Sequence, residues 1–180
     1  MRKGIRPARP IAAVLLVLLP ALSCTAYAQE PAALVPLKFL VGAWKAKGGG
    51  APGAGAGAYS FEPSLQGRII IRNSFAEYPA SAGMPAYRHD DLMVIYADTG
   101  STAGADYYDS EGHLIRYDVQ VVHPGEAVFT SRRAAGEMRY RLTYRMSGEG
   151  TLAGTFEVAP PGKDFATYLS WTSEKAKTDR

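Results

Sequence analysis

The sequence predicts an all-β fold: a single antiparallel meander β-barrel of about 8–10 strands with a short N-terminal helix. Three observations predict it. Short segments rich in β-branched and aromatic residues follow one another from Tyr59 to Trp171. Tight turns join these segments, and no helical pattern lies between them. Several strands whose edges must be hidden also favour closure into a barrel.

The first 28 residues have the pattern of a cleavable signal peptide. Four basic residues and no acidic one precede an apolar run over residues 11–19. This run is too short to span a membrane as a helix. Ala26-Tyr27-Ala28 follows, with small residues at its first and third positions, so we expect cleavage after Ala28. An alternative stays open at Cys24, because Ala21-Leu22-Ser23-Cys24 loosely resembles the lipobox of a lipoprotein.

Cleavage at this position divides the chain into a signal peptide over residues 1–28, a barrel over 29–171 and a polar C-terminal tail over 172–180. The expected location is the periplasm or the medium. The whole chain has 20 Lys and Arg residues against 17 Asp and Glu residues, but four of the basic ones precede the cleavage site. The remaining net charge is close to zero, and no basic patch predicts a nucleic-acid partner. Cleavage also removes the only cysteine, so packing alone must stabilise the domain.

The predicted helix lies between Pro31 and Val41. Leu34, Leu37 and Leu40 fall on one face, and Pro36 limits the helix to one or two turns. The glycine-rich residues 48–58 then predict a flexible connection between two strands, with a mobile loop over 51–58. Their match to G-x-G-x-x-G does not predict nucleotide binding, because a strand and not a helix follows.

Further strands are expected over residues 68–78, 91–97, 105–109, 113–122, 127–131, 139–146, 151–158 and 165–171. Their connections contain the Gly, Asp, Ser and Pro residues of tight turns. Alternation along a strand predicts which side chains point inward. On the last strand this places Phe165, Thr167, Leu169 and Trp171 on the inner face.

Gly42-Ala43-Trp44, between the short helix and the first strand, resembles the G-x-W signature of the calycins, the superfamily of lipocalins and fatty-acid-binding proteins. Residues 37–44, 61–72, 89–96, 107–113 and 156–171 are similar to small exported bacterial lipocalin-like domains of uncharacterised function. The resemblance implies a barrel with a ligand-sized cavity, closed at one end by Trp44. Lipocalins usually carry an arginine just beyond the final strand, stacked on this tryptophan. Here Thr172-Ser173-Glu174-Lys175 follows Trp171, which departs from that pattern.

The predicted ligand-binding residues are inward aromatic and imidazole side chains of three strands: His113, Tyr117, Tyr140, Tyr144 and Trp171. Aromatic walls with few polar groups are typical of a pocket for an apolar or amphipathic small molecule. The sequence therefore favours a small-molecule-binding barrel that is a monomer or a weak dimer, with no membrane span after the signal peptide. The competing interpretation is a barrel filled by its own side chains.

Two other function classes stay open. A haem-binding barrel similar to the nitrobindins would share the G-x-W-like start and the glycine-rich sequence after it. The haem histidine of that family lies late in the chain, however, and no histidine follows His123, so no resident cofactor is expected. An enzyme would depend on an inward His–Tyr cluster for acid–base chemistry. No catalytic residue is predicted, since no nucleophile motif is present, and no metal site is predicted, since at most His89 and Asp91 share a strand face.

Overall fold

The structure, a computed structural model, describes residues 30–177 except 51–54, 82, 100 and 135. The proposed signal peptide, Cys24 and the expected new N-terminus therefore lie outside the described residues. The described elements are a 3₁₀-helix and ten strands: η1 (Val35–Leu40), β1 (Gly42–Gly50), β2 (Gly55–Ser64), β3 (Ile69–Tyr78), β4 (Tyr87–Ala97), β5 (Ala103–Asp109), β6 (Leu114–His123), β7 (Glu126–Ser131), β8 (Arg139–Gly148), β9 (Thr151–Ala159) and β10 (Ala166–Lys175).

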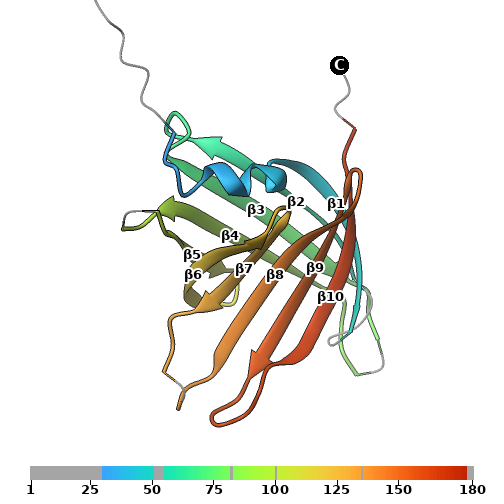
Figure 1. Ribbon diagram of the computed structural model, residues 1–180. Coiled ribbons are helices and arrows are strands. Elements are labelled where there is room, and N and C mark those ends of the chain that lie inside the picture. Colours follow the sequence, from blue (N-terminus) through green and yellow to red (C-terminus); the bar gives the residue numbers. More distant parts are fainter. Residues whose placement is uncertain (1–29, 51–54, 82, 100, 135, 178–180) are drawn as a thin grey trace, which may run out of the picture.

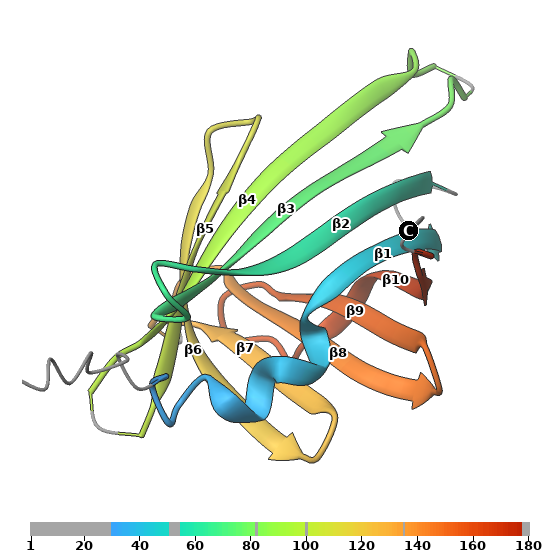
Figure 2. The same ribbon diagram turned by 90° about the horizontal axis from the view of Figure 1, so that it is seen from above.

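The ten strands form one closed antiparallel barrel. Each strand pairs with its neighbour in the chain, and β1 closes the barrel by pairing with β10. Figures 1 and 2 show the sheet from the side and from above, with η1 in blue lying across one end. The prediction of an all-β antiparallel barrel is confirmed. No helix among the described residues is long and apolar enough to cross a membrane.

The predicted N-terminal helix is only a six-residue 3₁₀-helix. Its backbone bonds join residues three apart, as in the bond from the Leu37 N–H to the Leu34 carbonyl at 3.0 Å. Pro36 lies in the first turn of η1, where its missing N–H breaks no bond within the helix, so it limits extension only toward the N-terminus. A 3₁₀-helix has three residues per turn, so Leu34, Leu37 and Leu40 lie on one side, and all three are fully buried.

The glycine-rich segment is more regular than the sequence predicts. Strand β1 continues to Gly50 and β2 begins at Gly55, so residues 55–58 belong to the sheet, and only 51–54 lie outside the described residues. The small side chains permit a close approach between strands. A Cβ atom at Gly57 would lie 2.1 Å from the carbonyl oxygen of Phe75 on β3. Close packing against β3 therefore explains why this glycine- and alanine-rich segment is a strand.

Inward and outward faces follow the predicted alternation on β6 and β8. Ile115, Tyr117 and Val119 are buried on β6, whereas the residues between them are exposed. At the start of β10 the prediction is wrong for Thr167 and for Phe165 just before the strand, because the pairing with β9 shifts between Thr167 and Leu169. Such a bulge adds one residue and reverses the faces on one side of it.

The end of β10 also differs from the predicted division of the chain. Residues 172–174, which the sequence places in a polar tail, pair with both β1 and β9, and Lys175 pairs with β1. Ser173 is fully buried, and the hydroxyl of Tyr59 on β2 donates to its Oγ at 2.7 Å. This part of the chain therefore belongs to the sheet that closes the barrel.

Candidate functional site

The barrel contains a cavity of about 630 Å³ at the end opposite η1. Small-molecule sites in proteins usually have volumes of roughly 300–1,000 Å³. Ten aromatic residues from eight strands contribute to its wall: Tyr59, Phe75, Tyr78, Tyr87, Tyr107, Tyr117, Tyr140, Phe156, Tyr168 and Trp171. The η1 end is instead filled by buried side chains, including Leu37, Leu40 and Trp44. One half of the barrel is thus packed, and the other half is hollow.

Four of the five predicted ligand-binding residues line this cavity: His113, Tyr117, Tyr140 and Trp171. The ring of Tyr140 is stacked on Phe156, with 5.9 Å between ring centroids and 8° between planes. Trp171 lies against the backbone of β9, where a Cβ atom at Gly154 would come within 2.1 Å of the indole. A glycine is therefore needed beneath this ring. His113 precedes β6 at the rim, and its side chain is 66% exposed.

Tyr144 does not line the cavity, in contrast to the prediction. It points inward, as its parity requires, but it is fully buried in the packed half of the barrel. Its ring makes edge contacts with Phe61, Phe129 and Trp171 at centroid distances of 5.4, 6.1 and 5.8 Å. Its hydroxyl has no hydrogen-bond partner among the described residues. Burial raises its pKa above the ordinary tyrosine value.

Trp44 lies at the packed end, as the sequence predicts. It is 1% exposed, and its Nε1–H donates to the Leu40 carbonyl at 2.8 Å. The side chain of Lys175 places Nζ 5.6 Å from the centroid of the indole ring. A cation therefore does lie over this tryptophan. The resemblance to lipocalins did not predict this cation, because β10 continues four residues past Trp171, to the position opposite Trp44 on β1.

A buried ion pair lies on the cavity wall between β3 and β4. One guanidinium nitrogen of Arg72 donates to Asp91, and another donates to the Ser74 hydroxyl at 3.0 Å. The side chains of Arg72 and Asp91 are 8% and 6% exposed. Burial lowers the pKa of Arg72, but the Asp91 carboxylate and the neighbouring Tyr144, Tyr107 and Tyr59 together outweigh burial and raise it above the usual arginine value. Arg72 therefore keeps its positive charge in this buried position.

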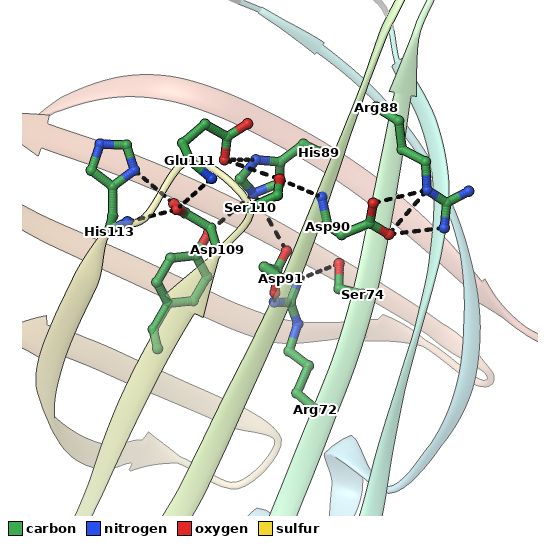
Figure 3. A network of polar contacts seen from close by, with 11 residues as sticks. Arg72, Ser74, Arg88, His89, Asp90, Asp91, Asp109, Ser110, Glu111 and His113 are labelled. Carbon is green, nitrogen blue, oxygen red and sulfur yellow. Dashed lines mark hydrogen bonds and ion pairs between the residues drawn. The ribbon is translucent and has the colours of Figure 1, made fainter.

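A second cluster of polar side chains lies at the mouth of the cavity, where the β5–β6 turn meets β4 (Figure 3). His89 Nδ1 is 2.8 Å from Glu111, and its Nε2 is 3.1 Å from the Tyr107 hydroxyl. Asp109 accepts a bond of 2.8 Å from the backbone N–H of His113 and lies 2.8 Å from the imidazole Nδ1 of the same residue. Burial raises the pKa of Asp109, but these two bonds and the electrostatic contributions of His113 and His89 together outweigh burial and lower the pKa below the usual aspartate value.

Most of this polar cluster could not be predicted from the sequence. Alternation predicts at most His89 and Asp91 on one strand face, whereas the last residue of β5 adds Asp109 and the turn after it adds Glu111. Alternation along a strand cannot reveal a contact between a strand and a neighbouring turn. Arg72 was missed for another reason: Ile69, Ile70 and Ile71 precede it, and three isoleucines in succession conceal which parity is inward.

Comparison with known proteins shows the fold alone. No family model and no curated protein matches the chain. Rv2717c from M. tuberculosis has a TM-score of 0.58 and 12% identity over 83% of this chain and 100% of that chain. A redesigned β-barrel has a TM-score of 0.40 and 13% identity over 83% of this chain and 98% of its own. A barrel bound to DFHBI has a TM-score of 0.37 and 11% identity over 78% and 97%. The likeness to Rv2717c supports the barrel fold and leaves membership of the calycins an expectation.

Proposed function

We propose that this protein is an exported barrel that binds an apolar or amphipathic small molecule in the cavity opposite η1. The observation that carries the proposal is the contrast between the two halves of the barrel interior. Aromatic and aliphatic side chains pack the η1 half, whereas the other half holds a cavity of about 630 Å³. Because a barrel of this size can fill itself, an aromatic-walled cavity favours a bound ligand over the filled-barrel interpretation.

The wall of the cavity favours a ligand with a flat apolar part. Tyr140 and Phe156 stack nearly parallel, and Tyr168 packs its edge on Phe156 at 6.3 Å. Aromatic side chains in these arrangements offer both faces and edges to a planar molecule. Polar groups occur at two places, around Arg72 on the wall and around His89 at the mouth. An amphipathic molecule can therefore bury its apolar part and leave its polar part near one of these groups.

Displacement of a fluorescent fatty-acid analogue tests this proposal. The parent protein should show saturable binding, and Tyr140→Ala should weaken it by about twofold to tenfold, since aromatic contacts contribute roughly 0.5–1.5 kcal/mol. Tyr108→Ala is the matched control. Tyr108 is 45% exposed and borders a second, more open depression on the outside of the barrel. Absence of saturable binding by the parent contradicts the proposal, and loss only in Tyr108→Ala moves the site to the outer face.

Native mass spectrometry of the purified protein then tests the class of ligand. A co-purified lipid or other apolar molecule supports the proposal. Co-purified haem would replace it with the haem-binding alternative. In this structure His113 is mostly exposed at the rim and its Nδ1 faces Asp109, so no observation singles it out as an iron ligand.

Export is supported by the sequence of residues 1–28 and is tested separately. Intact-mass analysis of a sample from the periplasm or the medium should show a chain that begins at residue 29. A diacylated chain beginning at Cys24 would establish the lipoprotein alternative. A chain that keeps residues 1–28 would contradict both.

A further inference from the structure

Three donor groups of different chemistry converge at the mouth of the cavity from two elements. A nitrogen of His89 on β4 and one oxygen each of Asp109 and Glu111, at the end of β5 and in the following turn, lie within 4.8 Å of one another. We propose that these three side chains bind one divalent transition-metal ion, such as Zn²⁺. Imidazole together with carboxylates is a donor set that such ions accept.

The surroundings of His89 match those of a metal ligand. Its Nδ1 faces Glu111 at 2.8 Å, and its Nε2 faces the Tyr107 hydroxyl at 3.1 Å and Asp91 at 3.6 Å. A metal-binding histidine presents one nitrogen to the ion and usually donates the other N–H to a carboxylate, carbonyl or water. Nδ1 is therefore the ligand atom, and Tyr107 and Asp91 hold the imidazole in place.

Asp109 is also held in position. Its side chain is 5% exposed, and it accepts bonds from the backbone N–H groups of Glu111 at 3.1 Å and His113 at 2.8 Å. The His113 imidazole contacts its other oxygen at 2.8 Å. Glu111 is 43% exposed on the turn, so it can adjust to an ion. The site thus combines two positioned donors with one adaptable donor (Figure 3).

The charges around the cluster favour a dication. Three carboxylates lie together, on Asp91, Asp109 and Glu111, and Arg72 neutralises one of them. The other nearby arginines have separate partners: Arg88 pairs with Asp90 and Glu77 on the outer face of β4, and Arg133 pairs with Glu137 in its own loop. Two formal negative charges are left, on Asp109 and Glu111, and one divalent ion balances them.

A bound ion would join the β5–β6 turn to β4. Three protein ligands also leave coordination positions for water or for a donor atom of a bound molecule, as in catalytic metal sites. This metal proposal stands without the proposed small-molecule binding, because it depends only on the polar cluster. The two are tested in separate assays, so that either can fail alone.

The experiment titrates chelator-treated parent protein with Co²⁺ and follows the visible absorption of the bound ion, with Zn²⁺ as competitor. We expect one ion per chain, displaced by Zn²⁺, and a Zn²⁺-dependent rise in the midpoint of thermal unfolding. His89→Gln and Glu111→Gln should each weaken binding at least about tenfold. His123→Gln and Asp90→Asn are the matched controls, because both residues are exposed and lie outside the cluster, and they should bind as the parent does.

Two results overturn the proposal: no Co²⁺ or Zn²⁺ binding by folded parent protein, or equal binding by the parent and the His89→Gln and Glu111→Gln variants. Circular dichroism of each variant establishes that it is folded. Glu111 lies in an exposed turn, so its substitution keeps the test valid even where a change at His89 disturbs the barrel. Displacement of the fatty-acid analogue in the presence of chelator reports on the cavity independently.

Discussion

Trp44 combines packing with one hydrogen bond at the closed end of the barrel. Replacing it with alanine should lower the free energy of unfolding by roughly 3–5 kcal/mol, as expected for a large buried aromatic side chain. Trp44→Phe keeps most of the packing but loses the bond to the Leu40 carbonyl, and it should cost less than Trp44→Ala. Urea unfolding measures both. A loss below about 0.5 kcal/mol for Trp44→Ala, typical of surface positions, would contradict the buried role.

Arg72 and Asp91 form a buried ion pair. Removing one partner should lower the free energy of unfolding strongly, whereas replacing both with apolar residues should lower it little. Arg72→Met leaves the carboxylate without its cation, so we expect a loss of about 3–5 kcal/mol in the free energy of unfolding. The double variant Arg72→Met/Asp91→Leu removes both charges and should recover most of that loss. A double-mutant cycle by urea unfolding checks this, and additive losses would show that the pair is not coupled.

Single residues were predictable where one residue type carries a local signal. Trp44 stands in the G-x-W pattern, and Tyr117, Tyr140 and Trp171 follow from alternation along their strands. The Arg72–Asp91 pair depends on the register between β3 and β4, which no local pattern encodes. The same holds for Tyr144. Alternation shows that it points inward, but it cannot show which half of the interior is packed.

The end of β5 presents Asp109, and the β5–β6 turn presents Glu111 and His113. Gly112 in this turn has a φ of 89°, a conformation that other residues adopt at a cost of about 1–2 kcal/mol. No atom lies within 4 Å of a Cβ built there, so only backbone strain opposes a side chain. Gly112→Ala should therefore destabilise the protein by about 1 kcal/mol in urea unfolding.

Gly136 is the matched control for this prediction. A Cβ atom there also meets no atom within 4 Å, and its φ lies outside the left-handed range. Gly136→Ala should change the free energy of unfolding by less than about 0.5 kcal/mol. Equal effects at the two positions would show that backbone strain at Gly112 is absent.

At the scale of elements, strands with alternating large side chains were predictable, and those built from glycine and alanine were not. Residues 55–58 carry no propensity for a strand, and they are extended because β1 and β3 pair with them on both sides. The bulge in β10 could not be predicted from the local sequence either, because it arises from the register against β9. Local sequence gave the number of strands more reliably than their ends.

The molecule as a whole should lose stability at alkaline pH. Burial raises the pKa of Tyr59, Tyr107, Tyr117 and Tyr144 above the ordinary value of 10.0. Above that value the unfolded chain releases protons that the folded barrel retains. The free energy of unfolding therefore falls as pH rises, by up to about 1.4 kcal/mol per pH unit for each such group. Below about pH 9 these tyrosines should contribute no pH dependence.

Urea unfolding at about pH 8 and about pH 11, together with tyrosinate absorbance, measures this effect. The Tyr144→Phe variant removes one of the groups and keeps the ring, so its stability should fall less steeply with pH. Its hydroxyl has no partner among the described residues, so the variant should be no less stable than the parent at neutral pH. Full ionisation of all tyrosines near pH 10 in the folded state would contradict the prediction.

The pairing of β1 with β10 also constrains the order in which the chain can assemble. A ribosome makes β1 early and β10 last, so β1 has only β2 as a partner until nearly the whole domain has been synthesised. The nascent sheet then has two open edges, and one of them is β1, which carries Lys45 and Lys47 but ends in three glycines, where no side chain discourages pairing with another molecule. Closure joins residues far apart in the chain, which makes it an intrinsically slow step. A closed barrel therefore requires protection of its first strand during synthesis, either by delayed folding or by a chaperone.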